Sequence, residues 1–454
     1  MSKKYDVIIV GAGPAGLFAA YELTKKKRNI KVLLIEQGNP ISKRARTETM
    51  TGMGGAGTFS DGKLHFTLVL SHEKLLDIFS AEEYKKAINY VDRLFIQFGA
   101  NSPYTPENYD EAMQLVKNCQ KKGIHLYLRR CKHVGSDELP KIVDTIVKTL
   151  EKREVDILCN TKINEILTKN GKVIGLKNNS KTFQAQFYLL APGRIGASWL
   201  QEQSKEIGIN YSYQQVEIGV RVEFPASLME EHSRIMHENI YSVHVPTYDD
   251  IVRTFCPCPN GKVAIENYGQ FISVNGYSNA NSKSDNSNFN LTTVVQLTEP
   301  VENTLDYAIA IAKTATIIGG GKPLIQRLSD LQAGRRSTWS RINRNFVIPS
   351  LKNVTPGDIS MALPHRTVTD ILEGLQMLDK VLPGINSGST LLYAPEIKLR
   401  GNRIRVNRKM QTEIPNLFVA GDGAGTSGNI VGAAISGIFA ARGILNYCKQ
   451  NQNK

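Results

Sequence analysis

The feature that most constrains the fold is a glycine-rich turn between an apolar strand and a helix near the start of the chain. Residues 5–10 (YDVIIV) are mostly apolar and of strand length, residues 11–16 read GAGPAG, and residues 17–27 carry a helical pattern. Residues 31–35 (KVLLI) predict a second buried strand. A βαβ unit of this kind predicts a parallel sheet with helices on both faces.

The spacing of these glycines is typical of sites that bind a dinucleotide. Gly11 permits the tight turn, Gly13 lets the backbone approach a pyrophosphate, and Gly16 allows close packing of helix on strand. The helix N-terminus adds free N–H groups and the positive end of the helix dipole. Glu36 ends the second strand, where a carboxylate suits the two ribose hydroxyls of an adenosine. The residues of this unit expected at the dinucleotide are Gly11, Gly13, Pro14, Ala15, Gly16, Glu36 and Gln37.

Two further segments distinguish FAD from NAD by resemblance. Residues 412–422 (TEIPNLFVAGD) form a turn, a buried strand and then Gly-Asp, and they resemble the second FAD fingerprint of the two-dinucleotide-binding-domain flavoprotein group. Residues 191–194 (APGR) resemble that group's third motif, a strand that ends in Ala-x-Gly beside the pyrophosphate. The resemblance implies that FAD is the cofactor and that Asp422 accepts hydrogen bonds from its ribitol chain. We expect cofactor contacts from Ile163, Ala191, Gly193, Gly421 and Asp422.

The last predicted helix begins within residues 428–434 (GNIVGAA). By the same resemblance, its N-terminus points at the pyrimidine edge of the flavin. Backbone N–H groups there would stabilise the negative charge that develops on the flavin during reduction. A glycine-rich helix start selected for packing alone is the alternative. The residues expected at the flavin are Gly428, Asn429 and Ile430.

The glycine-rich stretch at residues 52–64 (GMGGAGTFSDGKL) narrows the family. Its glycines suit close passage of backbone along a cofactor, and its polar side chains can reach the isoalloxazine. With residues 335–338, 356–360, 392–398 and 421–425, it resembles the FAD-dependent dehydrogenase family of bacteria and archaea, a group of NAD(P)/FAD-dependent oxidoreductases. The resemblance implies a fold and a cofactor and leaves the reaction open. The residues of this stretch expected at the cofactor are Gly54, Gly55, Ala56, Gly57, Ser60, Asp61 and Lys63.

The predicted elements fall into a discontinuous FAD-binding domain and an inserted domain. The pieces expected to form the FAD-binding domain are residues 1–66, 156–209 and 351–454. A small antiparallel meander over residues 163–190 is expected as its crossover. Residues 210–350 are rich in predicted strands and form the inserted domain, and residues 67–155 form a helical excursion that packs against either one. The predicted fold class is α/β, with a Rossmann-like FAD-binding domain (a parallel sheet with a β-meander crossover) and an inserted β-rich α+β substrate domain.

Four side chains are weaker candidates for a substrate pocket. Cys256 and Cys258 lie one residue apart, so near a flavin they can form a transient redox pair, although a disulfide at this spacing would be strained; two small side chains in a β-turn are the favoured interpretation. Arg335 belongs to an arginine cluster that can clamp an anionic substrate, and a solvated basic face is equally consistent. His365 is a candidate proton donor, although a packed or capping histidine is the default. No Cys or His spacing predicts a metal site.

The composition indicates a compartment and leaves the partners open. Six scattered cysteines argue against a disulfide framework, and residues 1–5 run directly into a strand pattern and not into a signal peptide. No apolar window approaches the ~20 residues that span a bilayer, so we expect a cytoplasmic protein without a membrane span. The net charge of +14 is compatible with an anionic substrate, an acidic partner or nucleic acid, and a solvated basic surface is favoured.

The chain carries one dinucleotide fingerprint and no second one, which favours a single FAD with a β-rich substrate domain over the flavin. We predict an enzyme, an FAD-dependent oxidoreductase that moves a hydride between flavin N5 and a small organic substrate, with NAD(P)H as a candidate external reductant. A tRNA-modifying or RNA-binding flavoprotein ranks lower, because the sequence shows no RNA-binding module. A flavoprotein subunit that passes electrons to a protein partner is the second alternative. A closed pocket over the flavin would favour the small-substrate enzyme. A basic groove would favour the RNA-binding flavoprotein, and a flat apolar patch would favour the subunit with a protein partner.

Overall fold

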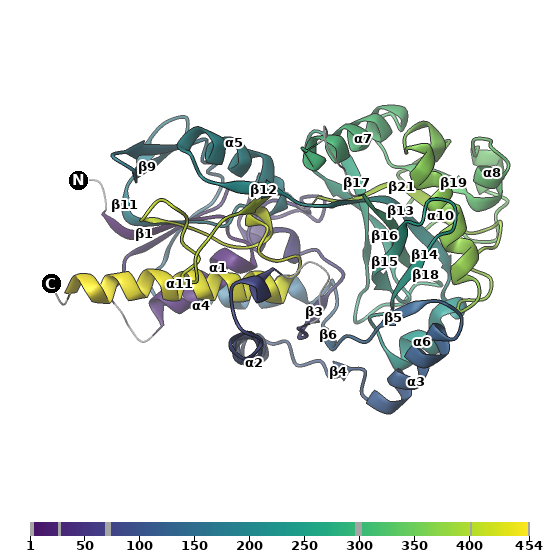
Figure 1. Ribbon diagram of the computed structural model, residues 1–454, viewed down its shortest axis with the longest axis horizontal. Coiled ribbons are helices and arrows are strands. Elements are labelled where there is room, and N and C mark those ends of the chain that lie inside the picture. The colour runs from purple at the N-terminus through teal and green to yellow at the C-terminus, as the bar shows by residue number, and fades with distance from the viewer. Residues whose placement is uncertain (1–3, 26–28, 69–73, 296–301, 400–401, 453–454) are drawn as a thin grey trace.

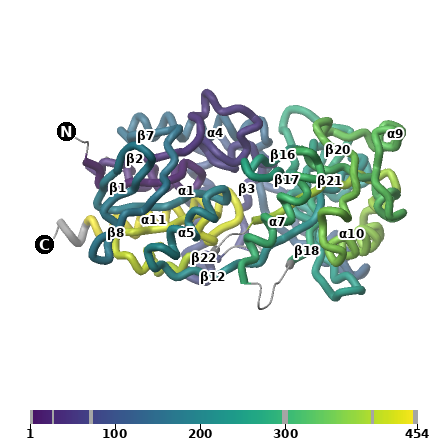
Figure 2. Tube along the Cα trace, turned by 90° about the horizontal axis from the view of Figure 1, so that it is seen from above, coloured from purple at the N-terminus to yellow at the C-terminus, as the bar shows by residue number. Residues whose placement is uncertain are grey.

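The computed structural model describes residues 4–25, 29–68, 74–295, 302–399 and 402–452, and it shows two lobes side by side (Figure 1). The first lobe is built around a five-stranded sheet and the second around an eight-stranded sheet. The view from above separates the same two groups of elements (Figure 2). Both ends of the chain lie in the first lobe, so the chain leaves this lobe to build the second one and then returns.

The sheet of the first lobe consists of parallel strands. In their order across the sheet they are β23 (Leu417–Val419), β11 (Ala185–Leu190), β1 (Tyr5–Val10), β2 (Val32–Ile35) and β7 (Asp156–Leu158). In β1, Val7 and Ile9 join one hydrophobic core, whereas Ile8 and Val10 join another. The strands are apolar on both faces because both faces are covered.

Helices cover one face of this sheet, and a mixed layer covers the other. The helices that share the core of Val7 and Ile9 are α1 (Pro14–Thr24), α2 (Ala81–Gln97), α4 (Leu139–Glu151) and α11 (Ile430–Gln452). The opposite face carries α5 (Ala197–Ile207) and an antiparallel meander. The meander strands are β8 (Glu165–Lys169), β9 (Lys172–Lys177) and β10 (Thr182–Phe183). The predicted parallel sheet with a β-meander crossover is therefore confirmed.

The C-terminal helix α11 is long and apolar enough to cross a membrane by length and composition alone. Its segment Ile430–Cys448 has 19 residues and a mean hydropathy of 1.4. This corrects our expectation that no apolar segment approaches the length needed to span a bilayer. However, 78% of this segment is buried inside the fold, where the helix packs along α1 (Figure 1). A helix that is apolar on all sides is typical of a protein core, and α11 is the core helix of the first lobe.

The sheet of the second lobe is mostly antiparallel. In order its strands are β20 (Thr355–Pro356), β19 (Leu324–Arg327), β21 (Leu391–Lys398), β13 (Val216–Pro225), β18 (Asn286–Val295), β15 (Ile251–Cys258), β14 (Ile240–His244) and β5 (His125–Tyr127). Helices α7 (Thr304–Ile318) and α10 (His365–Leu378) pack on one face. A hairpin of β16 (Lys262–Asn267) and β17 (Ile272–Tyr277) packs on the other face. The remaining short elements are α6 (Glu230–Ile235), α8 (Leu328–Gln332), α9 (Trp339–Ile342), β12 (Tyr211–Tyr213) and β22 (Asn402–Ile404).

The central strand β13 shows how the two faces of this sheet differ. Side chains alternate between the faces of a strand, and the even-numbered residues from 216 to 224 are apolar and join the core under α7 and α10. Glu217, Arg221 and Glu223 lie on the other face and are also buried. Buried charges are costly unless they are paired, so this second face carries a network of polar contacts.

The structure assigns two segments differently from the sequence analysis. Strand β21 pairs with β13 in the second sheet, although we expected residues 351–454 to belong to the FAD-binding domain. The excursion at 67–155 is divided, because α2 and α4 pack on the first lobe while β5 and α3 (Tyr109–Gln120) join the second. Between these parts, β3 (Lys63–His65), β6 (Cys131–His133) and β4 (Tyr104–Thr105) form a small sheet. Strand pairing over long sequence distances decides these assignments, and local patterns do not encode it.

Candidate functional site

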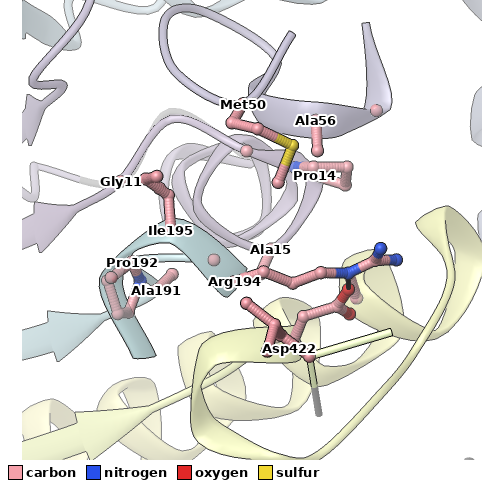
Figure 3. Close-up of a pocket in the computed structure, with 18 of the residues that line it drawn as sticks. Gly11, Pro14, Ala15, Met50, Ala56, Ala191, Pro192, Arg194, Ile195 and Asp422 are labelled. Atoms are coloured by element: carbon pink, nitrogen blue, oxygen red, sulfur yellow. Dashed lines mark hydrogen bonds and ion pairs between the residues drawn. The ribbon is translucent and has the colours of Figure 1, made fainter. Parts of the chain in front are cut away.

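A cavity of 660 Å³ lies between the two lobes. The first lobe lines it with the residues that follow β1, β2, β11 and β23, and Figure 3 shows this wall. The second lobe lines it with side chains from β15, β16, β17 and β21. The carboxyl ends of parallel strands meet at one edge of a sheet, where α/β folds bind their ligands. The cavity is therefore in the position expected of a ligand site.

Most residues that the sequence predicted at the cofactor line this cavity. They are Gly11, Gly13, Pro14, Ala15, Glu36, Gln37, Gly55, Ala56, Gly57, Ser60, Asp61, Lys63, Ile163, Ala191, Gly193, Gly421, Asp422, Gly428, Asn429 and Ile430. Gly16 and Gly54 are not among the lining residues. Gly54 instead lines a small apolar pocket with Leu17 and Val143.

The glycine turn leaves room for a ligand at one position and none at two others. Gly11 has a φ of +99°, and a Cβ there would lie 2.1 Å from the carbonyl oxygen of Ala191. A Cβ at Gly16 would lie 1.9 Å from the carbonyl oxygen of Gly11, so backbone packing requires both glycines. Within the described chain, a Cβ at Gly13 would meet only the Cα of Gly55, at 4.0 Å. Open space thus reaches the N-terminus of α1, where helix N–H groups lack partners.

Glu36 lines the cavity and also shapes the turns around it. Its Oε2 accepts a hydrogen bond from the amide of Ala12 at 2.9 Å, and its Oε1 accepts from the amides of Gly38 and Gly52, both at 2.9 Å. A carboxylate has about four acceptor positions, so three are taken by the backbone and about one is left for a ligand. The predicted ribose contact of Glu36 is thus compatible with a structural role that the sequence did not reveal.

Asp422 and Arg194 form an ion pair on the cavity wall (Figure 3). Arg194 Nε donates to Oδ2 of Asp422 at 2.9 Å, and the hydroxyl of Ser427 donates to Oδ1 at 2.9 Å. Burial lowers the pKa of Arg194, but the carboxylate of Asp422 outweighs burial and raises it above its usual value. Arg194 belongs to the motif at residues 191–194, but we did not predict it as a site residue.

Lys63 lines the cavity, but its ammonium group is held by three groups of the protein. Its Nζ lies 2.9 Å from Oδ2 of Asp61, donates to the carbonyl of Pro257 at 2.9 Å and donates to Glu238. An ammonium group has three hydrogens. Burial lowers the pKa of Lys63, and the two carboxylates more than compensate and raise it above its usual value. Lys63 is therefore a fixed positive charge beside the cavity.

His65 lies two residues further along β3 and lines the same cavity. Alternate residues of a strand share one face, so His65 and Lys63 approach the same carboxylate. The Nε2 of His65 lies 3.1 Å from Oε1 of Glu238, whose side chain is 3% exposed. Burial raises the pKa of Glu238, but Lys63 and then His65 outweigh burial and hold it below its usual value. No local sequence motif indicates this contact, because Glu238 comes from the second lobe.

The second lobe supplies the facing wall with buried polar groups. Lys398 Nζ lies 2.6 Å from Oε1 of Glu396. Glu266 accepts hydrogen bonds from the side-chain amide of Asn275 at 2.7 Å and from the hydroxyl of Tyr268 at 3.3 Å. Burial lowers the pKa of Lys398, but Glu396 raises it above its usual value. Apart from Cys256, this wall was missed from sequence, because its residues come from β15, β16, β17 and β21 without a recognisable motif.

Cys256 and Cys258 are free thiols, and only Cys256 lines the cavity. Cys256 has a φ of +44°, which is uncommon for a residue other than glycine. The sulfur of Cys258 accepts a hydrogen bond from Arg221 at 3.1 Å. Burial raises the pKa of both thiols, that of Cys258 to about 12. Both are therefore protonated at neutral pH, which suits the favoured prediction that they are inert.

Arg335 and His365 lie away from the cavity, which corrects their placement in a substrate pocket. Arg335 Nε lies 2.8 Å from the buried carboxylate of Asp330, which also binds Arg327 at 2.9 Å. His365 is exposed at the first residue of α10. Both residues were predicted in the pocket from their residue type alone. The path of the chain through the second lobe places them outside the cavity. In the described part of the chain, no group of three His, Cys, Asp or Glu side chains can hold a metal ion.

Comparison with known proteins agrees with this geometry. Residues 6–215 match a family model described as an FAD binding domain, and residues 215–399 match one described as an FAD-dependent protein, C-terminal domain-like. The chain belongs to the FAD-dependent oxidoreductases. Its cofactor is FAD, and the two matches meet at the start of β13, where the chain enters the sheet of the second lobe.

This FAD-dependent oxidoreductase resembles proteins from several bacteria. An uncharacterized protein of Clostridium beijerinckii is 27% identical over 96% of this chain and 80% of its own length. The NADH:fumarate oxidoreductase of Klebsiella pneumoniae is 28% identical over 43% of this chain and 21% of its own length. In the structure of glycine oxidase from Geobacillus kaustophilus, 95% of that chain aligns with 98% of this one at 13% identity and a TM-score of 0.44. In the structure of pyridoxine 4-oxidase from Mesorbium loti, 99% of that chain aligns with 98% of this one at 13% identity and a TM-score of 0.45. TM-scores this low do not indicate a shared reaction.

Proposed function

We propose that this FAD-dependent oxidoreductase transfers a hydride between flavin N5 and a small organic substrate that binds between the two lobes. The observation that carries the proposal is that the two walls of the cavity differ in kind. The first-lobe wall consists of the motifs expected at FAD, whereas the second-lobe wall carries polar and aromatic side chains that no FAD motif accounts for. These side chains are Phe255, Cys256, Glu266, Tyr268, Asn275 and Lys398.

The first-lobe wall fits the pyrophosphate and the adenosine ribose of FAD. The open space at Gly13 is where a pyrophosphate needs to approach the backbone, and the N-terminus of α1 offers N–H groups to its oxygens. Glu36 keeps an acceptor position for the adenosine ribose. We infer that Asp422 receives the ribitol hydroxyls and that the N-terminus of α11 faces the flavin.

The bound flavin supplies the hydride chemistry, and the protein supplies binding, orientation and charge. Lys63 and Lys398 place two buried positive charges at the cavity, and each is held by a neighbouring carboxylate. Glu266 and Tyr268 present oxygen atoms from the second-lobe wall, where they can orient a substrate.

The test is anaerobic stopped-flow mixing of the oxidised enzyme with a panel of amines, amino acids, alcohols and hydroxy acids, and with NADH and NADPH. Reduced enzyme is mixed in parallel with carbonyl, enoate and quinone acceptors. We expect at least one compound to react with saturation kinetics. Glu266→Gln should shift the half-saturating concentration, whereas Arg335→Gln, which lies outside the cavity, should not. Reaction only with a protein acceptor, or tight and selective tRNA binding, would replace this proposal with one of the two alternatives.

A further inference from the structure

One side chain on the cavity wall has both the chemistry of a proton carrier and the contact that orients one. We propose that His65 exchanges the proton that accompanies hydride transfer, and that Glu238 is the residue that positions it. The proposal rests on the proposed function, because it requires a substrate between the lobes. Among the described residues that line the cavity, His65 is the only histidine.

The other titratable groups on the wall are not suited to this role. Lys63 donates hydrogen bonds to Glu238 and Pro257 and is ion-paired with Asp61, and Lys398 is paired with Glu396 at 2.6 Å. Burial raises the pKa of Tyr268 well above 10 and also raises that of the Cys256 thiol. An imidazole has an ordinary pKa of about 6.5, so it can accept and release a proton near neutral pH.

One oxygen of Glu238 lies at ion-pair distance from His65, and the other accepts a hydrogen bond from Lys63. Its Oε1 lies 3.1 Å from Nε2 of His65, and its Oε2 accepts a hydrogen bond from Lys63. The side chain of His65 is 13% exposed, so its ring keeps access to the cavity. When Nε2 carries its hydrogen toward Glu238, the lone pair of the neutral ring is on Nδ1. The carboxylate then stabilises the imidazolium once Nδ1 has taken a proton, as the carboxylate of a hydrolase triad does.

Two further histidines and several charged or thiol groups surround this pair. His133 and His237 stack on each other with ring centroids 4.0 Å apart, and burial lowers the pKa of both. Neither ring lines the cavity, so both serve as neutral packing. The further charged or titratable groups that face the pair are Asp61, Lys63, Arg129, Cys131 and Cys256. Among the cavity-lining groups of the described chain, His65 is thus the one imidazole placed to exchange a proton with a substrate.

This assignment defines a class of substrate. In the oxidative direction, the C–H bond breaks and its electron pair leaves with the hydrogen for flavin N5. The neighbouring X–H bond breaks, where X is oxygen or nitrogen, and its electron pair becomes the π bond of C=X. The proton goes to Nδ1 of His65 and passes to water after product release. An imidazole is a strong enough base for a proton on O or N and too weak for an unactivated carbon acid, so the substrate is an alcohol or amine that becomes a carbonyl or imine, or the reverse.

The decisive experiment counts the protons that are taken up when the flavin receives two electrons. The midpoint potential of the FAD-loaded enzyme is measured against pH between about 6 and 8.5, and its slope gives this count. Reduction adds negative charge to the flavin, which raises the pKa of a nearby imidazole, so the wild type should take up about one proton more than His65→Gln over part of this range. Glu238→Gln removes the stabilising carboxylate and should move this step to lower pH. His244→Gln, whose side chain is 70% exposed on β14, is the matched control and should match the wild type.

The outcomes separate this proposal from the function on which it rests. An unchanged proton count in His65→Gln, or no additional proton in the wild type at any pH, would show that His65 is not the carrier. His65→Asn serves as a second variant, and the ratio of FAD to protein shows whether each variant keeps its cofactor. The count needs no substrate, so a compound panel without a hit would overturn the proposed function alone. Once a substrate is known, His65→Gln should slow flavin reduction by about 10²–10⁴-fold and remove the loss of rate at acidic pH.

Discussion

Substitutions at Gly11 and Gly13 separate the two reasons for glycine in the turn after β1. A Cβ at Gly13 projects into open space, with the Cα of Gly55 at 4.0 Å as its nearest neighbour in the described chain. Gly13→Val should therefore leave the apoprotein folded and remove the room that the pyrophosphate needs. Gly11→Ala should instead destabilise the fold itself, because the new Cβ would lie 2.1 Å from the oxygen of Ala191 at a φ of +99°.

The expected magnitudes follow from these geometries. A left-handed φ costs an alanine roughly 1–2 kcal/mol, and forced overpacking adds roughly 1–3 kcal/mol, so Gly11→Ala should cost about 2–5 kcal/mol of unfolding free energy. Gly123→Ala is the matched control, since Gly123 has a φ of +76° and nothing within 4 Å, and only the backbone term applies. Gly13 has an ordinary φ of −73° as the N-cap of α1, and a valine there should cost the apoprotein less than about 1 kcal/mol.

The assay combines urea unfolding of the deflavinated proteins with titration of each protein by FAD. At FAD concentrations about 100 times the dissociation constant, the wild type should gain about 2.7 kcal/mol of stability by mass action. Gly13→Val should gain almost none at the same concentration, which corresponds to at least a hundredfold loss of affinity. Full FAD occupancy of Gly13→Val would refute the placement of the pyrophosphate at this turn. If the Gly13→Val apoprotein were as unstable as the Gly11→Ala apoprotein, Gly13 would be required for the packing of the fold and not for the cofactor.

Four further predictions address other parts of the molecule. Asp422→Ala should weaken FAD binding roughly ten- to a hundredfold, about 1–3 kcal/mol, and an unchanged dissociation constant would show that the C-terminal motif does not touch the cofactor. Cys256→Ser combined with Cys258→Ser should keep the FAD spectrum and flavin reduction, unless dithionite titration shows that the wild type consumes two additional electrons. Burial and then Asp250 raise the pKa of Asp370 to about 6, so the stability that its protonated form contributes is complete below the unfolded pKa of about 3.9 and is lost as pH rises through 6. Asp370→Asn should therefore stabilise the fold by up to about 2 kcal/mol at pH 7–8 and not at pH 4, as urea unfolding at the two pH values will show. Binding to tRNA at about 150 mM salt should be weaker than micromolar and without preference among tRNAs, and anisotropy that shows tight, selective binding would favour the RNA-modifying alternative.

The first-lobe wall of the site could be predicted because short local motifs supply most of its residues. The turn at residues 11–16, the stretch at 52–64 and the segment at 412–422 each place a strand end, glycines and a polar residue within a few positions of one another. Such motifs fix backbone geometry over one turn, so their function can be inferred without knowledge of the remaining chain. The structure gathers all three at one cavity, as their common cofactor requires.

The buried polar face of the second-lobe sheet could not be predicted because it is made by pairing between distant strands. Residues 278–290 are polar and of low complexity, and their sequence favours an exposed loop. In the structure Asn286 begins β18, and Asn288 and Asn290 are buried. Asn288 accepts a hydrogen bond from Arg221 at 2.7 Å. Side chains that fill a buried polar sheet face have the composition of a loop, and only the neighbouring strand reveals the difference.

The charge of the whole chain also misleads about the cavity. A net charge of +14 allowed an anionic substrate or nucleic acid, but three cations of the cavity wall lie against carboxylates. The pairs are Lys63–Asp61, Lys398–Glu396 and Arg194–Asp422. A paired charge has little attraction left for a further anion, and in our proposal the pyrophosphate of FAD meets the N-terminus of α1 in place of a lysine. Hydrogen bonds and shape then contribute to substrate selection, and a neutral or zwitterionic alcohol or amine is compatible with this cavity, as an anion is.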